Sequence, residues 1–281
     1  MFKNYALVTG AGEGLGKFLS LELAKRKFNL VLVSLPGSGL HNLQQYIIHT
    51  YHVDVVCYEL DLSEEQSCYR LRESVSAENI LTSILINNAG MGGSFSFQEK
   101  APGFYTKLIN LNVTTPTLLC RLFLPDLVQQ QQAFIMNVSS LAGILHLPHK
   151  QVYGGTKSFL IAFSQSLRRE LKRQNVNVSV LCPGGMNTYW RLVMENRMMG
   201  TWLSRQSVME PCHVAAIAME KMLAGREFIV PGFWNRCFLL WNSILPNPVK
   251  DFLLNYQHRR TPTRIHTPSL SPSFVTIKSK R

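Results

Sequence analysis

Short apolar segments alternate with amphipathic stretches from residue 5 to about residue 181. Apolar, β-branched runs predict buried parallel strands at residues 6–9, 30–33, 53–58, 84–87, 134–138 and 176–181. Apolar positions spaced at three and four residues predict helices between them, including 15–27, 40–50 and 152–173. This order predicts an α/β fold with three αβα layers, in which a doubly wound parallel sheet is covered on both faces.

The regular alternation ends near Pro183. Residues 186–203 are expected to form a cover, residues 211–224 a further helix, and residues 228–230 a last strand. We expect one domain over residues 1–256, which ends in an amphipathic segment at 232–256. Residues 257–281 are rich in Thr, Pro and Ser and are expected to form a disordered basic tail.

Two groups of residues carry chemistry. Tyr153 and Lys157 are four positions apart and therefore lie on one helix face, where a fixed ammonium favours the phenolate. Ser140 ends an apolar run thirteen residues upstream. Near the start of the chain, Gly10 and Gly14 belong to a glycine-rich loop of the kind that lets a backbone approach a pyrophosphate. Together they indicate hydride transfer between a nicotinamide and an alcohol or ketone.

Six motifs in register resemble the short-chain dehydrogenase/reductase family over roughly the first 190 residues. They are TGxxxGxG from Thr9, NNAG from Asn87, an active-site Asn at Asn112, a serine-bearing strand end at Ser139 and Ser140, YxxxK from Tyr153, and PGxxxT from Pro183. A single glycine-rich loop is a common false positive, whereas six motifs in order are not. The resemblance implies a Rossmann-type fold.

The resemblance assigns four catalytic residues. Tyr153 would be the acid in reduction and the base in oxidation, and Lys157 would hold the nicotinamide ribose and lower the pKa of the phenol. Ser140 would bind the substrate oxygen, and Asn112 would position a water near Lys157. Gly155 and Thr156 depart from the family's usual Ala-Ser before the lysine, but they remove no reacting group.

The same resemblance gives an expected set of cofactor contacts: Gly10, Gly14, Leu15, Gly16, Ser34, Asp61, Leu62, Asn88, Ala89, Gly90, Tyr153, Lys157, Pro183, Gly184 and Thr188. Thr9 is expected to hold the glycine turn rather than to contact the cofactor. Asp61 has two interpretations: a contact to the adenine, or an acid at the N-terminus of the helix that begins near Ser63.

The choice between NAD(H) and NADP(H) depends on the end of the second strand. Ser34 stands where NAD-preferring members usually place Asp, which favours NADP(H) slightly. Leu35 replaces the Arg that many NADP-dependent members have, and Glu13 would repel a phosphate, so both oppose that preference. We expect NADP(H) to be slightly preferred over NAD(H).

Charge is distributed unevenly along the chain. Residues 1–149 hold 10 Lys and Arg against 11 Asp and Glu, and residues 150–281 hold 19 against 6. The basic half fits either an anionic surface or a solvated face. The apolar segment at 233–260 could contact a membrane peripherally, cap the substrate pocket or form a subunit interface. A nucleic-acid partner is not expected, because Phe274 is the lone aromatic residue after position 258.

No apolar stretch reaches the roughly 18 residues of a membrane span. Six scattered cysteines form no CxxC pair, so neither a metal site nor a disulfide framework is expected. We therefore expect a cytoplasmic protein, with peripheral membrane association as the alternative, and the family resemblance implies a homo-oligomer. The expected activity is NAD(P)-dependent oxidation or reduction of a hydrophobic, ketoacyl- or lipid-like alcohol or ketone. A nucleotide-binding scaffold without catalysis is the alternative.

Overall fold

The computed structural model describes residues 3–187 and 207–246 of the 281-residue chain. In this part, the strands form one parallel sheet with the order β3-β2-β1-β4-β5-β6-β7. The strands are β1 (Lys3–Thr9), β2 (Asn29–Ser34), β3 (Val55–Glu59), β4 (Ile80–Asn87), β5 (Ala133–Val138), β6 (Val176–Leu181) and β7 (Phe228–Ile229). The order reverses between β1 and β4, which opens a crevice at the carboxyl ends of these strands.

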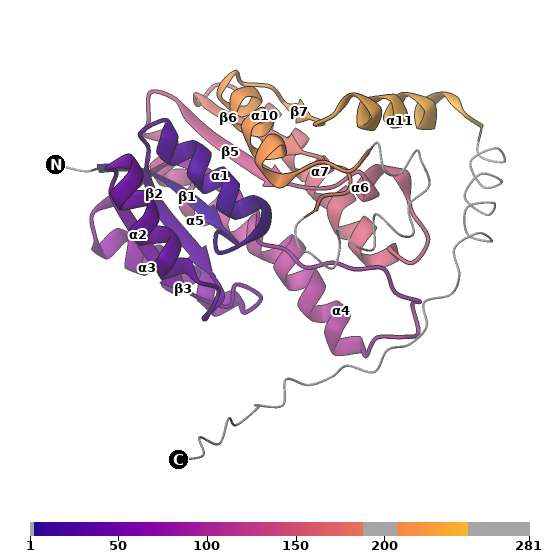
Figure 1. The fold of residues 1–281 in the computed structure, drawn as a ribbon, viewed down its shortest axis with the longest axis horizontal. Coiled ribbons are helices and arrows are strands. Elements are labelled where there is room, and N and C mark those ends of the chain that lie inside the picture. Colours follow the sequence, from indigo (N-terminus) through magenta and orange to yellow (C-terminus); the bar gives the residue numbers. More distant parts are fainter. Residues whose placement is uncertain (1–2, 188–206, 247–281) are drawn as a thin grey trace, which may run out of the picture. The chain divides into compact units, whose positions relative to one another are not determined.

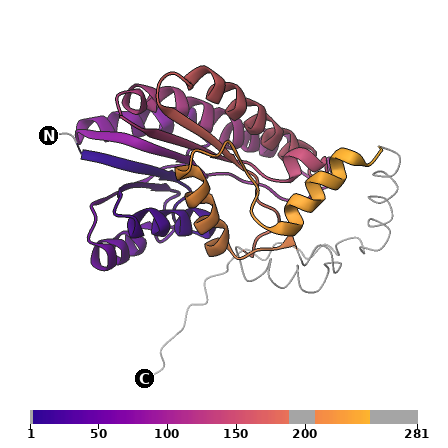
Figure 2. The same cartoon turned by 90° about the horizontal axis from the view of Figure 1, so that it is seen from above.

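Two layers of helices cover the sheet (Figures 1 and 2). One face packs against α1 (Gly14–Lys25), α2 (Leu40–Tyr51) and α10 (Pro211–Leu223). The other face packs against α3 (Glu65–Ala77), α5 (Thr115–Val128) and α7 (Gln151–Leu171). The doubly wound α/β fold expected from the sequence is therefore confirmed.

The side chains of β1 show why both faces need a cover. Ala6 and Val8 point into the first apolar cluster, and Tyr5 and Leu7 point into the second. All four are buried, because alternate residues of a strand face opposite sides of its sheet. An apolar run without alternation thus marks a strand that is buried on both faces.

In the described part of the chain, four further helical segments border the crevice or follow the last strand. They are α4 (Pro102–Ile109), the π-helical turn η1 (Asn110–Thr114), α6 (Ala142–Leu145) and α11 (Phe233–Ile244). The turn η1 joins α4 to α5 and carries Asn112. π-Helical turns are rare and are frequent at functional sites.

Residues 1–244 group as one compact unit and residues 245–281 as another. Every helix and strand named above belongs to the first unit. Thr188, most of the expected cover at 186–203 and the basic tail at 257–281 lie outside the described residues.

Candidate active site

A cavity of about 630 Å³ lies at the carboxyl ends of the central strands. It contains most of the site residues expected from the sequence: Gly10, Gly14, Leu15, Ser34, Asp61, Leu62, Asn88, Ala89, Gly90, Ser140, Tyr153, Lys157, Pro183 and Gly184. Gly16 and Asn112 do not line it, and Thr188 lies outside the described residues. Segments far apart in the chain meet here because the parallel strands all end at the same edge of the sheet.

The glycine loop between β1 and α1 has a backbone that requires glycine. Gly10 and Gly14 have φ angles of +65° and +54°, in the left-handed region. Gly16 has no such angle, but a Cβ placed on it would lie 2.0 Å from the carbonyl oxygen of Gly10. The loop thus delivers the N-terminus of α1 to the cavity, where free backbone N–H groups and the helix dipole suit a pyrophosphate.

The loop after β4 is fixed to the glycine loop by hydrogen bonds. The Thr9 hydroxyl accepts from the backbone N–H groups of Asn88 and Ala89 at 3.0 and 2.9 Å. The Asn88 Nδ2 donates to the carbonyl oxygens of Thr9 and Gly10. Thr9 is buried, does not line the cavity, and holds the turn.

Tyr153 lies near the start of α7, where its phenol meets Ser140. Burial raises the pKa of Tyr153 above its usual value, and the hydrogen bond with Ser140 lowers it in part. The net direction is upward, because an apolar environment disfavours the charged phenolate. The phenol is therefore protonated at neutral pH and able to donate a proton.

Lys157 is buried one turn further along α7. Its Nζ donates to the carbonyl oxygen of Val138 at 2.8 Å and lies 5.8 Å from the centroid of the Tyr153 ring. Burial lowers the pKa of Lys157 to about 8. The expected lowering of the Tyr153 pKa by Lys157 is not the net effect here, because burial acts more strongly on the phenol.

The two serines after β5 have different partners. Ser139 is buried, and its hydroxyl donates to the carbonyl oxygen of Lys157 at 2.7 Å. Ser140 accepts from the N–H of Ala142 at 3.2 Å and bonds with Tyr153. The hydroxyl that faces the phenol is therefore that of Ser140, whereas Ser139 connects the strand end to α7.

Asn112 binds to two neighbouring segments. Its Oδ1 accepts from the N–H of Met91, and its Nδ2 donates to the carbonyl oxygen of Met91 and to the Thr156 hydroxyl. Asn112 is buried, and a Cβ placed on Gly90 would lie 3.1 Å from the Asn112 Oδ1 and 3.4 Å from the Lys157 Nζ. Its amide thus joins the loop after β4 to α7. One of its partners is Thr156, which stands where the family usually has Ser before the lysine.

Asp61 is engaged at both carboxylate oxygens. Oδ1 accepts from the N–H and hydroxyl of Ser63, and Oδ2 accepts from the Lys107 Nζ at 2.9 Å. Burial raises the pKa of Asp61, but the bonds from Ser63 and Lys107 outweigh it and lower the pKa overall. The Ser63 bonds match the helix N-terminal interpretation, while Asp61 and Lys107 both line the cavity.

Two serine hydroxyls lie at the end of β2, next to Gly12. A Cβ placed on Gly12 would lie 2.8 Å from the Ser34 Oγ and 2.5 Å from the Ser38 Oγ. The Ser38 hydroxyl is buried and makes no hydrogen bond within the described residues. The carboxylate of Glu59 accepts from the N–H of Gly37 nearby, and Glu13 also lines the cavity.

The two glycines after Tyr153 differ in their surroundings. A Cβ on Gly154 would lie 2.9 Å from the carbonyl oxygen of Ala142, so Gly154 allows α6 to approach α7. Gly155 has no atom within 4 Å of such a Cβ. The backbone that approaches Gly154 closely is therefore that of α6.

The sequence analysis did not identify Lys107, Met91 or Gly92 as cavity residues. Gly92 stands against the Tyr153 ring, which a Cβ would approach to 2.7 Å. Met91 and Gly92 directly follow the NNAG motif, so their place after β4 was an available signal. Lys107 lies within α4, and the sequence held no signal for its place in the cavity, because its partner Asp61 is 46 positions away.

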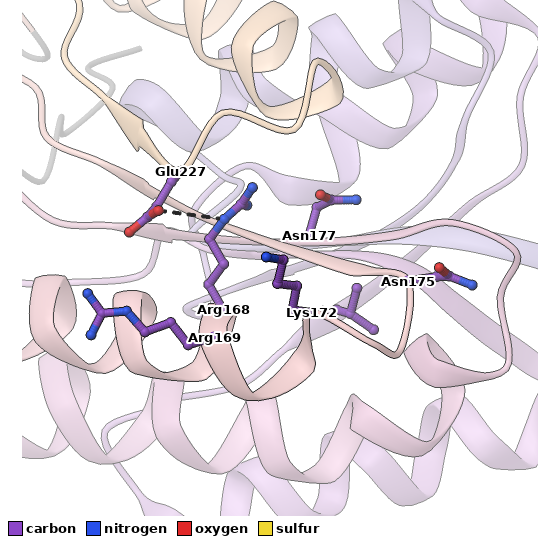
Figure 3. Close-up of a pocket in the computed structure, with 7 residues that line it drawn as sticks. Arg168, Arg169, Lys172, Asn175, Asn177 and Glu227 are labelled. Atoms are coloured by element: carbon purple, nitrogen blue, oxygen red, sulfur yellow. Dashed lines mark ion pairs between the residues drawn. The ribbon is translucent and has the colours of Figure 1, made fainter.

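A second cavity of about 460 Å³ lies at the other end of α7, near the starts of β6 and β7 (Figure 3). The Arg168 guanidinium donates to the carbonyl oxygens of Val178 and Gly225, both at 2.8 Å, and pairs with Glu227 at 3.7 Å. Arg169 points away from Glu227 in Figure 3. None of the residues expected in the site lines this cavity.

In the part of the chain that the structure describes, no helix combines the length and the apolar character that crossing a bilayer requires.

A family model described as short chain dehydrogenase matches residues 4–197. The chain is 26% identical over 258 residues to very-long-chain 3-oxoacyl-CoA reductase-A of Danio rerio, which covers 90% of this chain and 76% of that protein. It is 32% identical over 187 residues to 17-beta-hydroxysteroid dehydrogenase type 3 of Homo sapiens, over 66% of this chain and 60% of that protein. The second alignment thus leaves two fifths of the human protein unmatched.

A short-chain dehydrogenase from Sphingobium yanoikuyae, solved in complex with NADPH, matches with a TM-score of 0.74. The two sequences are 23% identical, and the match covers 97% of this chain and all of the other. At this identity the similarity shows the fold alone.

Proposed function

The chain belongs to the short chain dehydrogenase family, and we propose on this premise that it interconverts a ketone and a secondary alcohol with a nicotinamide cofactor. One observation carries the proposal. Tyr153 and Ser140 meet in the cavity that the glycine loop also lines. A scaffold without catalysis needs no phenol and hydroxyl directed at each other beside a buried lysine, so that alternative is not favoured.

The residues fit a dinucleotide. Gly10 and Gly14 line the cavity at the N-terminus of α1, where a pyrophosphate would bind, and Gly90 stands beside Lys157. We assign the cofactor contacts to the expected residues that line the cavity, with Lys157 at the nicotinamide ribose. Gly16 supports the loop without reaching the cavity, and the expected contact at Thr188 stays a prediction. When bound, the nicotinamide supplies or accepts the hydride.

The protein's own groups then handle the proton and the developing charge. In reduction, the Tyr153 hydroxyl donates its proton to the substrate oxygen as that oxygen gains negative charge. The Ser140 hydroxyl donates a hydrogen bond to the same oxygen and stabilises it. In oxidation, the phenolate takes the proton back. A positively charged Lys157 favours the phenolate and so assists this direction.

Asn112 supports this group from behind the cavity wall. Its bonds to Met91 and Thr156 hold the loop after β4 against α7, and so fix the position of Tyr153. We propose that Asn112 acts through this positioning. Its expected role in holding a water near Lys157 stays a prediction.

We propose a hydrophobic ketone as the substrate. Apolar side chains of Met91, Leu111 and Met186 line the cavity together with the polar groups. The relatives named above are reductases and dehydrogenases of very-long-chain 3-oxoacyl-CoA and of 17β-hydroxysteroids. Both substrate classes present a ketone on a large apolar body, and this shared chemistry supports the assignment.

For the cofactor, we propose a slight preference for NADP(H). Ser34 lines the cavity where a ribose phosphate would lie, and the buried Ser38 hydroxyl next to it, beside Gly12, has no partner within the described residues. Glu13 opposes the preference because it adds a negative charge to the same cavity.

We also propose a homo-oligomer that uses α7, where Phe159 is exposed and stacks on Phe163.

Titration of the purified protein with NADH and NADPH, read by energy transfer from its tryptophans, tests the proposal. We expect saturable binding of at least one cofactor. Gly14→Asp should lose this binding, because an aspartate is strained at the positive φ angle of Gly14 and its carboxylate would repel the pyrophosphate of the cofactor. Reduction of a panel of steroid and 3-oxoacyl ketones would follow. A folded protein that binds neither cofactor would contradict the proposal.

A further inference from the structure

The helix α11 exposes an unusual number of large apolar side chains. Phe233, Leu240, Trp241 and Ile244 are 66, 60, 49 and 72% exposed. At 3.6 residues per turn these positions fall within an arc of about 100° on one side of the helix. The half-buried Cys237 lies within the same arc. A surface helix normally turns such an apolar face toward the core, and a large exposed patch marks an interaction site.

The opposite side of α11 fixes this orientation. Asn235 is buried, and its Nδ2 donates to the carbonyl oxygens of Ser207 and Pro231 at 3.3 and 2.8 Å. Leu239 packs against the cluster of Leu141, Val180 and Cys182. The helix therefore cannot rotate its apolar arc inward without losing buried contacts. In both views α11 extends beyond the sheet (Figures 1 and 2).

We propose that this face of α11 docks on the surface of an anionic lipid bilayer. The apolar arc provides the aliphatic and aromatic side chains that enter the interfacial region, including a tryptophan. The sequence that follows the helix supplies the matching charge. Residues 247–281 contain seven basic residues and one acidic residue: Lys250, Arg259, Arg260, Arg264, Lys278, Lys280, Arg281 and Asp251.

Charge also decides between the bilayer and a second copy of this chain. A two-fold contact through α11 would add a second basic segment and no compensating acidic one, because residues 233–281 hold one acidic residue, Asp251. Anionic lipids instead attract juxtamembrane basic residues. A bilayer therefore satisfies both the apolar face and the charge that follows it, whereas a second copy satisfies the apolar face alone.

The docking face is connected to the cavity wall. A Cβ on Gly184 would lie 2.6 Å from the Asn235 Oδ1, so α11 packs directly against a residue that lines the main cavity. Docking would hold this wall close to the lipid, where hydrophobic ketones accumulate. This delivery step rests on the proposed function, whereas the docking itself does not.

Co-sedimentation of the full chain with vesicles tests the docking. We expect binding to vesicles of phosphatidylcholine mixed with phosphatidylserine, weaker binding to phosphatidylcholine alone, and a loss of binding in high salt. The variant Leu240→Glu with Ile244→Glu should bind the anionic vesicles at least tenfold more weakly. The control Tyr46→Glu with Ile48→Glu adds the same charge to exposed positions of α2 and should bind like the wild type.

Other outcomes would overturn the proposal. Equal binding by both double variants would show that α11 is not the docking face. Failure of the wild type to bind, with a dimer that Leu240→Glu and Ile244→Glu convert to a monomer, would identify a second copy as the occupant. If the glutamate variant unfolds at a lower temperature than the wild type, Leu240→Gln with Ile244→Gln replaces it.

A soluble short-chain ketone separates this proposal from the proposed function. Docking variants should reduce it at the wild-type rate and lose activity on a vesicle-borne ketone. A protein that binds vesicles but reduces neither ketone keeps the docking face and loses the enzyme assignment. A protein that reduces both ketones but does not bind vesicles keeps the enzyme assignment and loses the docking face.

Discussion

The two ends of α7 both border a cavity, but they differ in what surrounds their polar groups. At the first end, Lys157 is buried and Tyr153 is half-buried, among groups from the loop after β4, from β5 and from α6. At the second end, Arg169 and Lys172 are exposed. The cavities, of about 630 and 460 Å³, are of comparable size. Size therefore does not distinguish a reaction site from a surface hollow.

The difference lies in what each group does for the fold. Arg168 has three interactions that join α7 to β6 and to the segment before β7, so its charge has a structural use. Cations at the end of a helix also interact favourably with its dipole. Within the described residues, the Tyr153 hydroxyl has one hydrogen-bond partner, Ser140, and does not join elements as Arg168 does. Buried groups that the fold does not need are the better indication of chemistry.

Removal of one polar side chain from each end of α7 should show the difference between the two ends most strongly. Tyr153→Phe should lower kcat by about 10³-fold, because it deletes a general acid while leaving the ring in place. Its cofactor affinity should stay near that of the wild type. Arg169→Gln at the other end should leave kcat and KM unchanged. Equal losses in both variants, measured by steady-state kinetics, would remove the distinction.

The buried Lys157 predicts a dependence of stability on pH. Its pKa is about 8 in the folded protein and 10.5 in the unfolded chain, so the unfolded state binds more protons between these values. The free energy of unfolding should therefore rise by about 2 kcal/mol from pH 8 to pH 9.5. Denaturant titrations without cofactor would measure it. Lys157→Met should abolish this rise, and an unchanged slope in that variant would refute the assignment.

Arg168 should affect stability without affecting catalysis. Arg168→Met leaves the carbonyl oxygens of Val178 and Gly225 without their donor, at a cost of about 2 kcal/mol. Arg169→Met is the matched control and should change stability by less than about 0.5 kcal/mol. Urea unfolding of both variants would measure the difference, and kcat/KM should be that of the wild type. A loss of activity in folded Arg168→Met would connect the second cavity to the reaction.

The smallest effect separates the two neighbouring glycines of α7. Gly155→Ala should stabilise the protein by about 1 kcal/mol, because alanine favours the helix and meets open space. Gly154→Ala gains the same helix propensity but presses on the carbonyl oxygen of Ala142, so it should destabilise instead. Thermal unfolding would give the sign of each change. Stabilisation by both would mean that α6 yields to the added methyl group.

The sequence predicted the sheet better than it predicted contacts across the site. Strands such as β1 and β5 are buried on both faces, so their apolar runs are unmistakable. Motif residues were found where the strand ends bring them together, as for Gly10 and Asn88. The pairing of Lys107 with Asp61 could not be read from the sequence, because it depends on how α4 packs.

The Tyr153 pKa shows a second limit of sequence reasoning. The spacing of Tyr153 and Lys157 predicts the helix face that they share, but it does not predict the net direction of the pKa of the phenol. Burial decides that direction, and burial depends on Gly92 and on the whole surrounding wall. The outward apolar arc of α11 was also hidden, because an amphipathic pattern does not tell which side meets the core.

Transfer of deuterium tests the central claim most directly. The protein would be given a hydrophobic ketone with NADPH or NADH that carries deuterium at one of the two C4 positions of the nicotinamide, and the product would be examined by mass spectrometry. We expect an alcohol with deuterium at the carbinol carbon from one of the two labelled forms, and about 10³-fold less of it with Tyr153→Phe at matched times. Cofactor binding without any labelled alcohol, or equal labelling in Tyr153→Phe, would contradict it.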